Sequence, residues 1–255
     1  MPTPFMHLHV AEQMLTALAK RPEVNGRLHT QLCENLPAFY FGNIAPDFPA
    51  VCNFRRSDSH FHHIPPATDE DPFANMLAAY PHLRPAANLD PGHAVFIGAY
   101  GAHLLLDVMW FHQVVIPYFV EPPNLGERSH RRLLHFSTLT YLDRKARAAL
   151  PAKVGSTLNA APSDGRLPFG RASDLRQWRD LVAEQLFPGA ASKTVEIFAG
   201  RLSLSPAEFA ANLDNRQWME TVLFPFVPIE KIELMLQTAV PRSIQLLTDY
   251  LFPAA

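Results

Sequence analysis

Apolar residues recur at helical spacing from the start of the chain. The first stripe, at i, i+4, i+7, i+8 and i+11, consists of His7, Ala11, Met14, Leu15 and Leu18. Thr3 followed by Pro4 predicts the N-terminus of this helix, with Thr3 as the N-cap, and the helix is expected to run to about residue 20. His9 shares its face with polar residues instead. We therefore expect His7 to point inward and His9 outward.

Helical patterns continue along the rest of the chain. They cover residues 28–40, 72–79, 91–115, 127–149, 174–187, 191–201, 205–223 and 228–251. Pro117 is expected to stop the apolar helix over residues 91–115, and Pro241 is expected to kink or divide the last helix. Residues 41–49 are predicted to be irregular because of their prolines, and residues 53–72 to form a polar loop. No alternating strand pattern of useful length occurs, so the sequence predicts an all-α multi-helix bundle.

The composition changes once along the chain. Residues 151–170 are rich in Pro, Gly, Ser, Asn and Asp, which is typical of a connecting segment. This predicts a helical domain over residues 1–150 and a C-terminal helical extension over residues 171–255, packed on the same domain. A chain of 255 residues is long enough to bury a substantial core.

Charge and targeting signals exclude several classes. The 22 basic and 24 acidic residues give a formal charge of −2, so no nucleic-acid partner is expected from charge. The N-terminus lacks the basic start and apolar core of a secretory signal, and Cys33 and Cys52 are expected to be reduced thiols, so a cytoplasmic location is predicted. The apolar run over residues 94–111 has the length of a short membrane span. It contains His103 and Asp107, which are costly in a bilayer, so we expect a buried core helix and no transmembrane segment. The oligomeric state stays open.

The same two residues carry the first chemical signal. His103 and Asp107 are four residues apart in an apolar stretch, so on a helix they project from one face. A buried charge needs a partner or a metal, and all twelve histidines lie at or before residue 135. Other inward or loop-borne ligand types are His7, Asp47 and His60. Imidazole and carboxylate together suit zinc, and a carboxylate can bridge two ions. His62 and His63 are alternatives to His60 in the same loop.

Four segments carry a resemblance to a known family. Residues 1–8 (MPTPFMHL), 42–47 (GNIAPD), 56–61 (RSDSHF) and 98–107 (GAYGAHLLLD) resemble, in order and separation, the zinc-dependent phospholipase C family, over about residues 1–150. That family is all-helical and cleaves phosphodiesters at up to three zinc ions, and the S1/P1 nucleases share its fold. The resemblance implies one zinc held by Asp47, His60, His103 and Asp107, with Asp107 bridging to a second zinc that His7 also binds.

The resemblance also shows where the chain departs from the family. Secreted members free an N-terminal residue that binds metal, whereas this chain begins at Met1 without a visible cleavage site, so incomplete ligation of the second zinc is expected. The third zinc of the family uses a further histidine and a His-x-x-x-Glu pair, and no such pair occurs here. The weaker candidates for that site are His112, Glu127, His130 and His135. Two zinc ions are therefore expected, and a third is not supported.

These observations favour a zinc-dependent hydrolase that acts on a phosphodiester or phospholipid substrate through a metal-activated water. Asp47 is predicted to be a ligand that also serves as the catalytic base. Arg56 is predicted to bind the substrate phosphate, and Arg55, Arg131 and Arg132 are further arginines able to do so. Two alternatives are a non-catalytic metal-binding helical protein and an S1/P1-like nuclease. An HD-type phosphohydrolase is disfavoured because the chain contains no His-Asp dipeptide.

Overall fold

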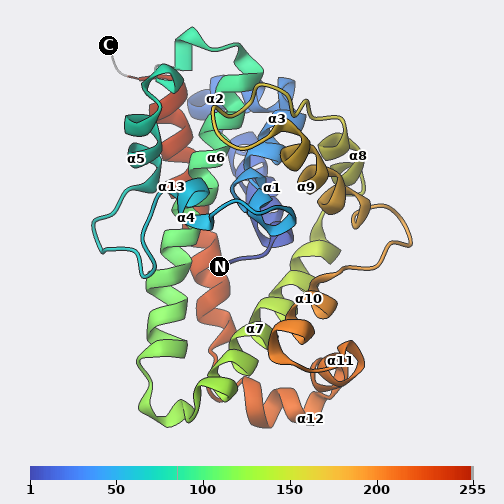
Figure 1. The fold of residues 1–255 in the computed structure, drawn as a ribbon. Coiled ribbons are helices and arrows are strands. Elements are labelled where there is room, and N and C mark those ends of the chain that lie inside the picture. The colour runs from blue at the N-terminus through green and yellow to red at the C-terminus, as the bar shows by residue number, and fades with distance from the viewer. Residues whose placement is uncertain (85, 254–255) are drawn as a thin grey trace.

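Helix α6 (Pro91–Trp110) runs through the centre of the bundle in the computed structural model, which describes residues 1–84 and 86–253 (Figure 1). Nearly all of its side chains are buried, and it packs against α3 (Leu36–Gly42) and α13 (Ile229–Leu251). All regular secondary structure in the described part of the chain is helical, which confirms the all-α prediction.

The first helix forms as its sequence predicts. Helix α1 (Pro4–Ala19) begins after Thr3, whose side chain accepts a hydrogen bond from the Met6 backbone N–H at 3.5 Å. It packs against α2 (Pro22–Glu34), α7 (Arg128–Ala149) and α13. His7 is buried, whereas His9 is half-buried and lies 3.0 Å from the Gln13 amide nitrogen. The apolar stripe therefore brings His7 into the core.

The prediction that Pro117 stops the central helix is wrong. The chain continues from α6 into a π-helix (Phe111–Val120) that contains Pro117. The wider π turn relieves the clash that a proline ring makes with the preceding turn of an α-helix, so the helical path is kept. By length and composition the Pro91–Val120 segment is the one described helix able to cross a membrane, but 83% of its most apolar window is buried inside the protein. Its apolar surface is part of the core.

Two segments predicted as loops contain short helices. A 3-10 helix (Ala45–Val51) follows α3, so residues 41–49 are ordered rather than irregular. Pro46 lies in its first turn, where the missing N–H has no partner in any case. Helix α4 (Arg56–His60) lies within the predicted polar loop, and α5 (Pro72–Ala79) follows with Asp71 as its N-cap. Both corrections concern the segments that carry Asp47 and His60.

The regular elements of the described C-terminal part are all helices, joined by loops. Its elements are α8 (Lys153–Asn159), α9 (Ala172–Glu184), α10 (Thr194–Leu202), α11 (Pro206–Asp214), α12 (Arg216–Trp218), a π-helix (Met219–Leu223) and α13; single 3-10 turns occur earlier, at Pro81–Leu83, Ala86–Asn88 and Pro123–Leu125. Helix α8 lies inside the predicted connecting segment, and Asn215 interrupts the predicted 205–223 helix by capping α12. Helix α13 continues through Pro241, which faces solvent, where water can satisfy the freed carbonyl. The division into residues 1–150 and 171–255 stays a prediction.

Candidate metal centre

Helix α6 presents His103 and Asp107 from one face, as their spacing predicts. Both side chains are fully buried, and the His103 Nε2 atom lies 3.5 Å from Asp107 Oδ2. Burial alone raises the pKa of the Asp107 carboxyl, but His103, together with His60 and His7, holds it well below its usual range. The carboxylate is therefore ionised in the centre of the protein, where a negative charge requires compensation.

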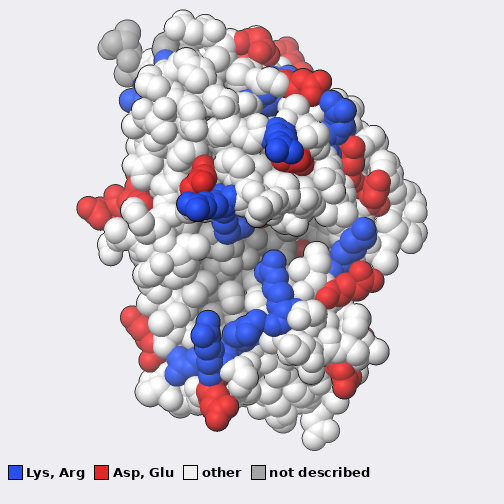
Figure 2. Space-filling view, in the orientation of Figure 1, with Lys and Arg blue, Asp and Glu red and all other residues white. Residues whose placement is uncertain are grey.

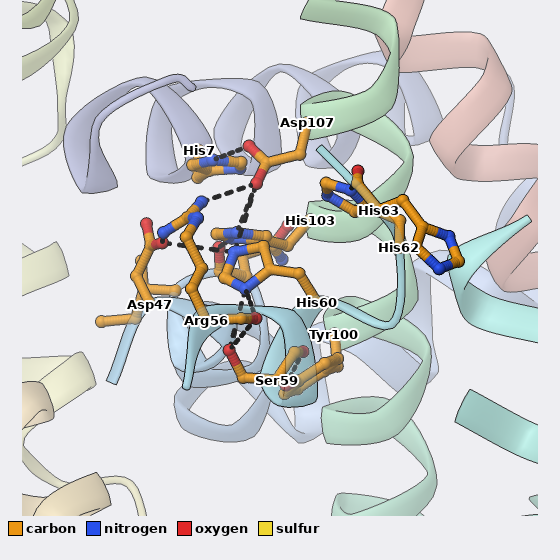
Figure 3. A network of polar contacts seen from close by, with 12 residues as sticks. His7, Asp47, Arg56, Ser59, His60, His62, His63, Tyr100, His103 and Asp107 are labelled. Atoms are coloured by element: carbon orange, nitrogen blue, oxygen red, sulfur yellow. Dashed lines mark hydrogen bonds and ion pairs between the residues drawn. The ribbon is translucent and has the colours of Figure 1, made fainter. Parts of the chain in front are cut away.

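Two further histidines converge on this carboxylate from other helices (Figure 3). His7 of α1 places Nε2 3.4 Å from Asp107 Oδ1, and its ring stacks on that of His103 with centroids 3.7 Å apart. His60 of α4 places Nε2 3.3 Å from Asp107 Oδ2 and 3.4 Å from Asp47 Oδ1. The structure thus gathers His7, Asp47, His60, His103 and Asp107 at one place, although they come from four separate elements.

Backbone carbonyls orient two of these rings. His103 donates from Nδ1 to the Asn43 carbonyl at 2.7 Å, and His60 Nδ1 lies 3.1 Å from the Arg56 carbonyl. With Nδ1 facing a carbonyl, each ring turns Nε2 toward the carboxylates. Neither Nε2 atom has a hydrogen-bond partner among the described residues. A histidine held through one nitrogen, with the other left for a cation, is the usual arrangement of a metal ligand.

Gly42 makes the first of these contacts possible. A Cβ atom on Gly42 would lie 2.3 Å from the Phe96 carbonyl oxygen and 2.7 Å from the Ala99 Cβ atom. Only glycine lets α3 approach α6 this closely, and this approach brings the Asn43 carbonyl onto His103.

The donors form two groups able to hold a metal ion. His7, His103 and Asp107 make one group, and Asp47, His60 and His103 make the other; within each group the ligand atoms lie within 4.8 Å of one another, and every member is buried. His103 belongs to both. Mixed imidazole and carboxylate donors suit zinc, and the partnerless Nε2 atoms supply lone pairs for it. The residues present therefore fit the predicted metal.

Arg56 is bound to the metal-ligand candidates themselves. Its guanidinium donates from Nη1 to Asp47 and from Nη2 to Asp107 Oδ2 at 3.0 Å, while 35% of its side chain stays exposed. Burial opposes ionisation of Asp47, but Arg56, aided by His60 and His103, lowers the pKa of this carboxyl strongly. Asp47 is therefore ionised, as a metal ligand must be, and its role as general base stays a prediction.

The neighbouring histidines of the same loop lie outside both groups. The His62 ring stands edge-on to that of His60 at 6.0 Å, and its Nδ1 lies 2.6 Å from the His63 carbonyl. His63 is 93% exposed and lies 3.1 Å from Glu70. Of the three loop histidines, His60 is the one placed between the two aspartates.

The four weaker candidates also lie outside these groups. His112 Nε2 lies 3.3 Å from the Ala67 carbonyl, and Glu127 is the exposed residue that precedes α7. His130 stands edge-on to Phe226. His135 packs against Phe119, and burial lowers its pKa to about 3. In the described part of the chain, they form no third cluster of metal ligands.

Several supporting residues were not foreseen from the sequence. The Tyr100 hydroxyl donates to the Ser59 carbonyl, next to His60. The Trp178 indole of α9 donates to the Ile44 carbonyl at 2.7 Å and thereby fixes the start of the 3-10 helix that carries Asp47. Backbone carbonyls accept all these bonds, as Asn43 does, and a carbonyl has no side-chain signature in a sequence.

Comparisons with known proteins agree with this geometry. The sequence model of the family described as zinc dependent phospholipase C matches residues 6–192, a range that contains all five ligand candidates and extends past residue 150. No curated protein and no solved structure matches the chain. The matched range is well over half of the 255 residues, so the chain belongs to the zinc-dependent phospholipase C family.

Proposed function

We propose that the protein is a zinc-dependent phosphodiester hydrolase of the phospholipase C type. One observation carries the proposal: three buried imidazoles direct partnerless nitrogens at two ionised carboxylates, and Arg56, which pairs with both carboxylates, has a side chain that is 35% exposed. Family membership supports the choice of zinc and of hydrolysis.

The gathered donors would hold two zinc ions. His103 Nδ1 is bound to the Asn43 carbonyl, so its single free nitrogen would serve only one ion, together with Asp47 and His60. His7 would serve the other, and Asp107 lies within reach of both. When bound, zinc polarises a phosphoryl oxygen and lowers the pKa of water, which is the chemistry that a diester hydrolase needs at neutral pH. The protein supplies the orientation: the carbonyls of Asn43 and Arg56 hold the His103 and His60 rings.

Arg56 defines the substrate side of the centre in this proposal. Its exposed edge retains N–H groups that are not directed at Asp47 or Asp107, and these suit a phosphoryl oxygen. Its positive charge also keeps Asp47 ionised and so available as a ligand.

The test combines metal content with turnover. Wild-type protein is expected to contain about two zinc ions by elemental analysis, to hydrolyse bis(p-nitrophenyl) phosphate, and to release diacylglycerol from a phospholipid. His103→Ala is expected to lose both zinc and turnover, whereas His63→Ala, at an exposed site in the same loop, keeps both. A zinc-loaded, folded protein that cleaves none of these diesters, nor single-stranded DNA, contradicts the proposal; cleavage of DNA alone supports the nuclease alternative.

A second candidate function is a non-catalytic metal-binding protein. The observation that favours it is Arg56, which pairs with both carboxylates and competes with a cation for them. One zinc with four protein ligands, bound without turnover, supports this alternative, because a closed tetrahedral site is structural whereas a catalytic site keeps an open position.

A cytoplasmic location is part of the proposal. Cys33 and Cys52 are both free thiols, as is usual in a reducing compartment. Fractionation of the native host distinguishes this location from secretion.

A further inference from the structure

Basic side chains line both edges of a hollow on the face that carries the metal centre. In Figure 2, Lys and Arg residues gather over α4 at one edge and over α7 and α10 at the other (Figures 1 and 2). Arg56 belongs to α4, Arg132 to α7 and Arg201 to α10. Arginines from three helices thus converge on one opening.

Arg201 lies within electrostatic reach of the centre. Burial and the positive charges of Arg56 and Arg132 lower the pKa of the Arg201 guanidinium. The negative charge of Asp47 raises it. Helix α10 therefore places a positive charge opposite Arg56 and Asp47, although 145 residues of sequence separate Arg201 from Arg56.

An aromatic pair holds the two arginines of the far edge. The Phe136 and Phe198 rings stack with centroids 4.8 Å apart, which joins α7 to α10. The Arg132 guanidinium lies over Phe136 at 5.8 Å, and that of Arg201 over Phe198 at 5.5 Å. Arg132 also donates from Nη2 to the Arg201 carbonyl. Cation–π contacts and this hydrogen bond pre-organise both side chains.

Neither of these arginines has an acidic partner. Over residues 1–84 and 86–253, no carboxylate forms an ion pair with Arg132 or Arg201, whereas Arg144, further along α7, pairs with Asp214 at 2.7 Å. Converging like charges without a counter-ion repel one another, and an anion bound between them removes that repulsion. Arg201 also lies beyond residues 6–192, the range that matches the family.

We propose that Arg132 and Arg201 form an anion subsite of the hydrolase, which selects a phosphodiester whose headgroup carries a second phosphate or carboxylate. The inference rests on the proposed function, because it places the diester at the metal centre and the second anion at the far edge of the hollow. Guanidinium groups bind phosphate oxygens through paired N–H donors, so a phosphate is the preferred anion.

The test uses substrates that differ by one phosphate. Zinc-loaded wild-type protein is assayed on phosphatidylinositol 4-phosphate and phosphatidylinositol in the same detergent micelles, and on the two corresponding deacylated glycerol diesters in solution. We expect kcat/KM to be about tenfold or more higher for each phosphorylated member, the size of effect that charge-assisted hydrogen bonds produce. A preference in the micelles alone assigns selectivity to the lipid surface and overturns the subsite.

Variants connect the preference to the two arginines. The double variant Arg132→Gln with Arg201→Gln is expected to bring the ratio of kcat/KM values close to one, Arg201→Lys to keep part of it, and Arg144→Gln to leave it unchanged. Zinc content and circular dichroism verify that each variant is folded. Cleavage of both lipids with equal efficiency, or a preference that survives the double variant, overturns the subsite while the proposed function stands.

A binding measurement separates the two proposals. If the zinc-loaded protein hydrolyses no diester, the proposed function fails, and titration calorimetry with inositol 1,4-bisphosphate then tests the subsite alone. Binding that the double variant abolishes supports it, and binding that is absent or unchanged in the variant overturns it.

Discussion

The rings of His7 and His103 stack almost in parallel, with planes 7° apart, although one belongs to α1 and the other to α6. Two imidazolium ions cannot share this contact without repulsion. Burial, followed by the charge of His103, accordingly lowers the pKa of His7 to about 4. His7 is therefore neutral near pH 7 and available as a ligand for a cation.

The position of His103 between the two donor groups predicts an unequal response to mutation. Its one free nitrogen, Nε2, can hold only one ion, but it also lies beside Asp107, so His103→Ala is expected to leave at most one weakly bound zinc per chain. His7→Ala and Asp47→Asn each act on one group, and each is expected to leave one tightly bound zinc. Elemental analysis after dialysis measures the three values, and His9→Ala, on α1 but outside both groups, serves as the control. Equal losses in all four variants contradict the assignment.

Gly42→Ala is expected to destabilise the protein by about 1–3 kcal/mol, the usual cost of overpacking a close contact. The new Cβ atom would meet the Phe96 carbonyl oxygen, which belongs to the backbone and cannot move aside as a side chain can. Gly200→Ala on α10 is the matched control, because a Cβ atom there meets nothing within 4 Å. This control is expected to be neutral or stabilising, since alanine favours a helix more than glycine does. Urea unfolding measures both free energies, and similar values for the two variants would show that α3 and α6 can separate without cost.

Arg56→Gln is expected to destabilise chelated protein more than zinc-loaded protein. After treatment with EDTA, Arg56 still pairs with both Asp47 and Asp107, so its removal leaves the fully buried Asp107 with histidine partners alone. Because the Arg56 side chain is 35% exposed, we expect a loss of about 1–3 kcal/mol, between the values for surface and buried pairs. Calorimetric unfolding with and without zinc measures the difference. A loss that zinc does not diminish contradicts the idea that Arg56 and the metal compensate the same charges.

Asp143 predicts a pH dependence of stability that is separate from the metal. It is buried on α7 and accepts a hydrogen bond from Thr194 Oγ1 at 2.7 Å, and burial raises its pKa to about 6. Since the folded state binds this proton more tightly than the unfolded state, whose ordinary value is 3.8, stability falls as the pH rises from about 4 to about 6 and then stays level.

Asp143→Asn is expected to remove this loss. The variant is expected to gain about 1–3 kcal/mol over wild type at pH 8, because the pKa of Asp143 is about 6 in the folded protein instead of 3.8, and to show no such gain at pH 4. Both are compared by urea unfolding in EDTA, with Asp214→Asn, 65% exposed, as the control. A gain that is the same at both pH values would show that Asp143 ionises as freely in the folded state as in the unfolded one.

The local sequence predicted the structure correctly where the interacting residues are close together in the chain. The helix starts at Thr3 and Asp71 follow from side chains that cap the next turn, and the shared face of His103 and Asp107 follows from a four-residue spacing on a helix. The burial of His7 follows from its place in an apolar stripe. In each case the interacting residues lie within one or two helical turns, so the period of the α-helix determines which side chains lie on the same face.

Tertiary packing decided the rest. The π turn that carries the chain past Pro117, the close contact of Gly42 with α6, and the Asn43 carbonyl on His103 all depend on elements far apart in sequence. The same is true of Arg201, which α10 brings opposite Arg56. A helical period determines which side chains share a face, but the distance between two faces depends on how the helices pack, and ligands must meet within a few ångströms. The sequence therefore identified the ligand types, and packing made them a site.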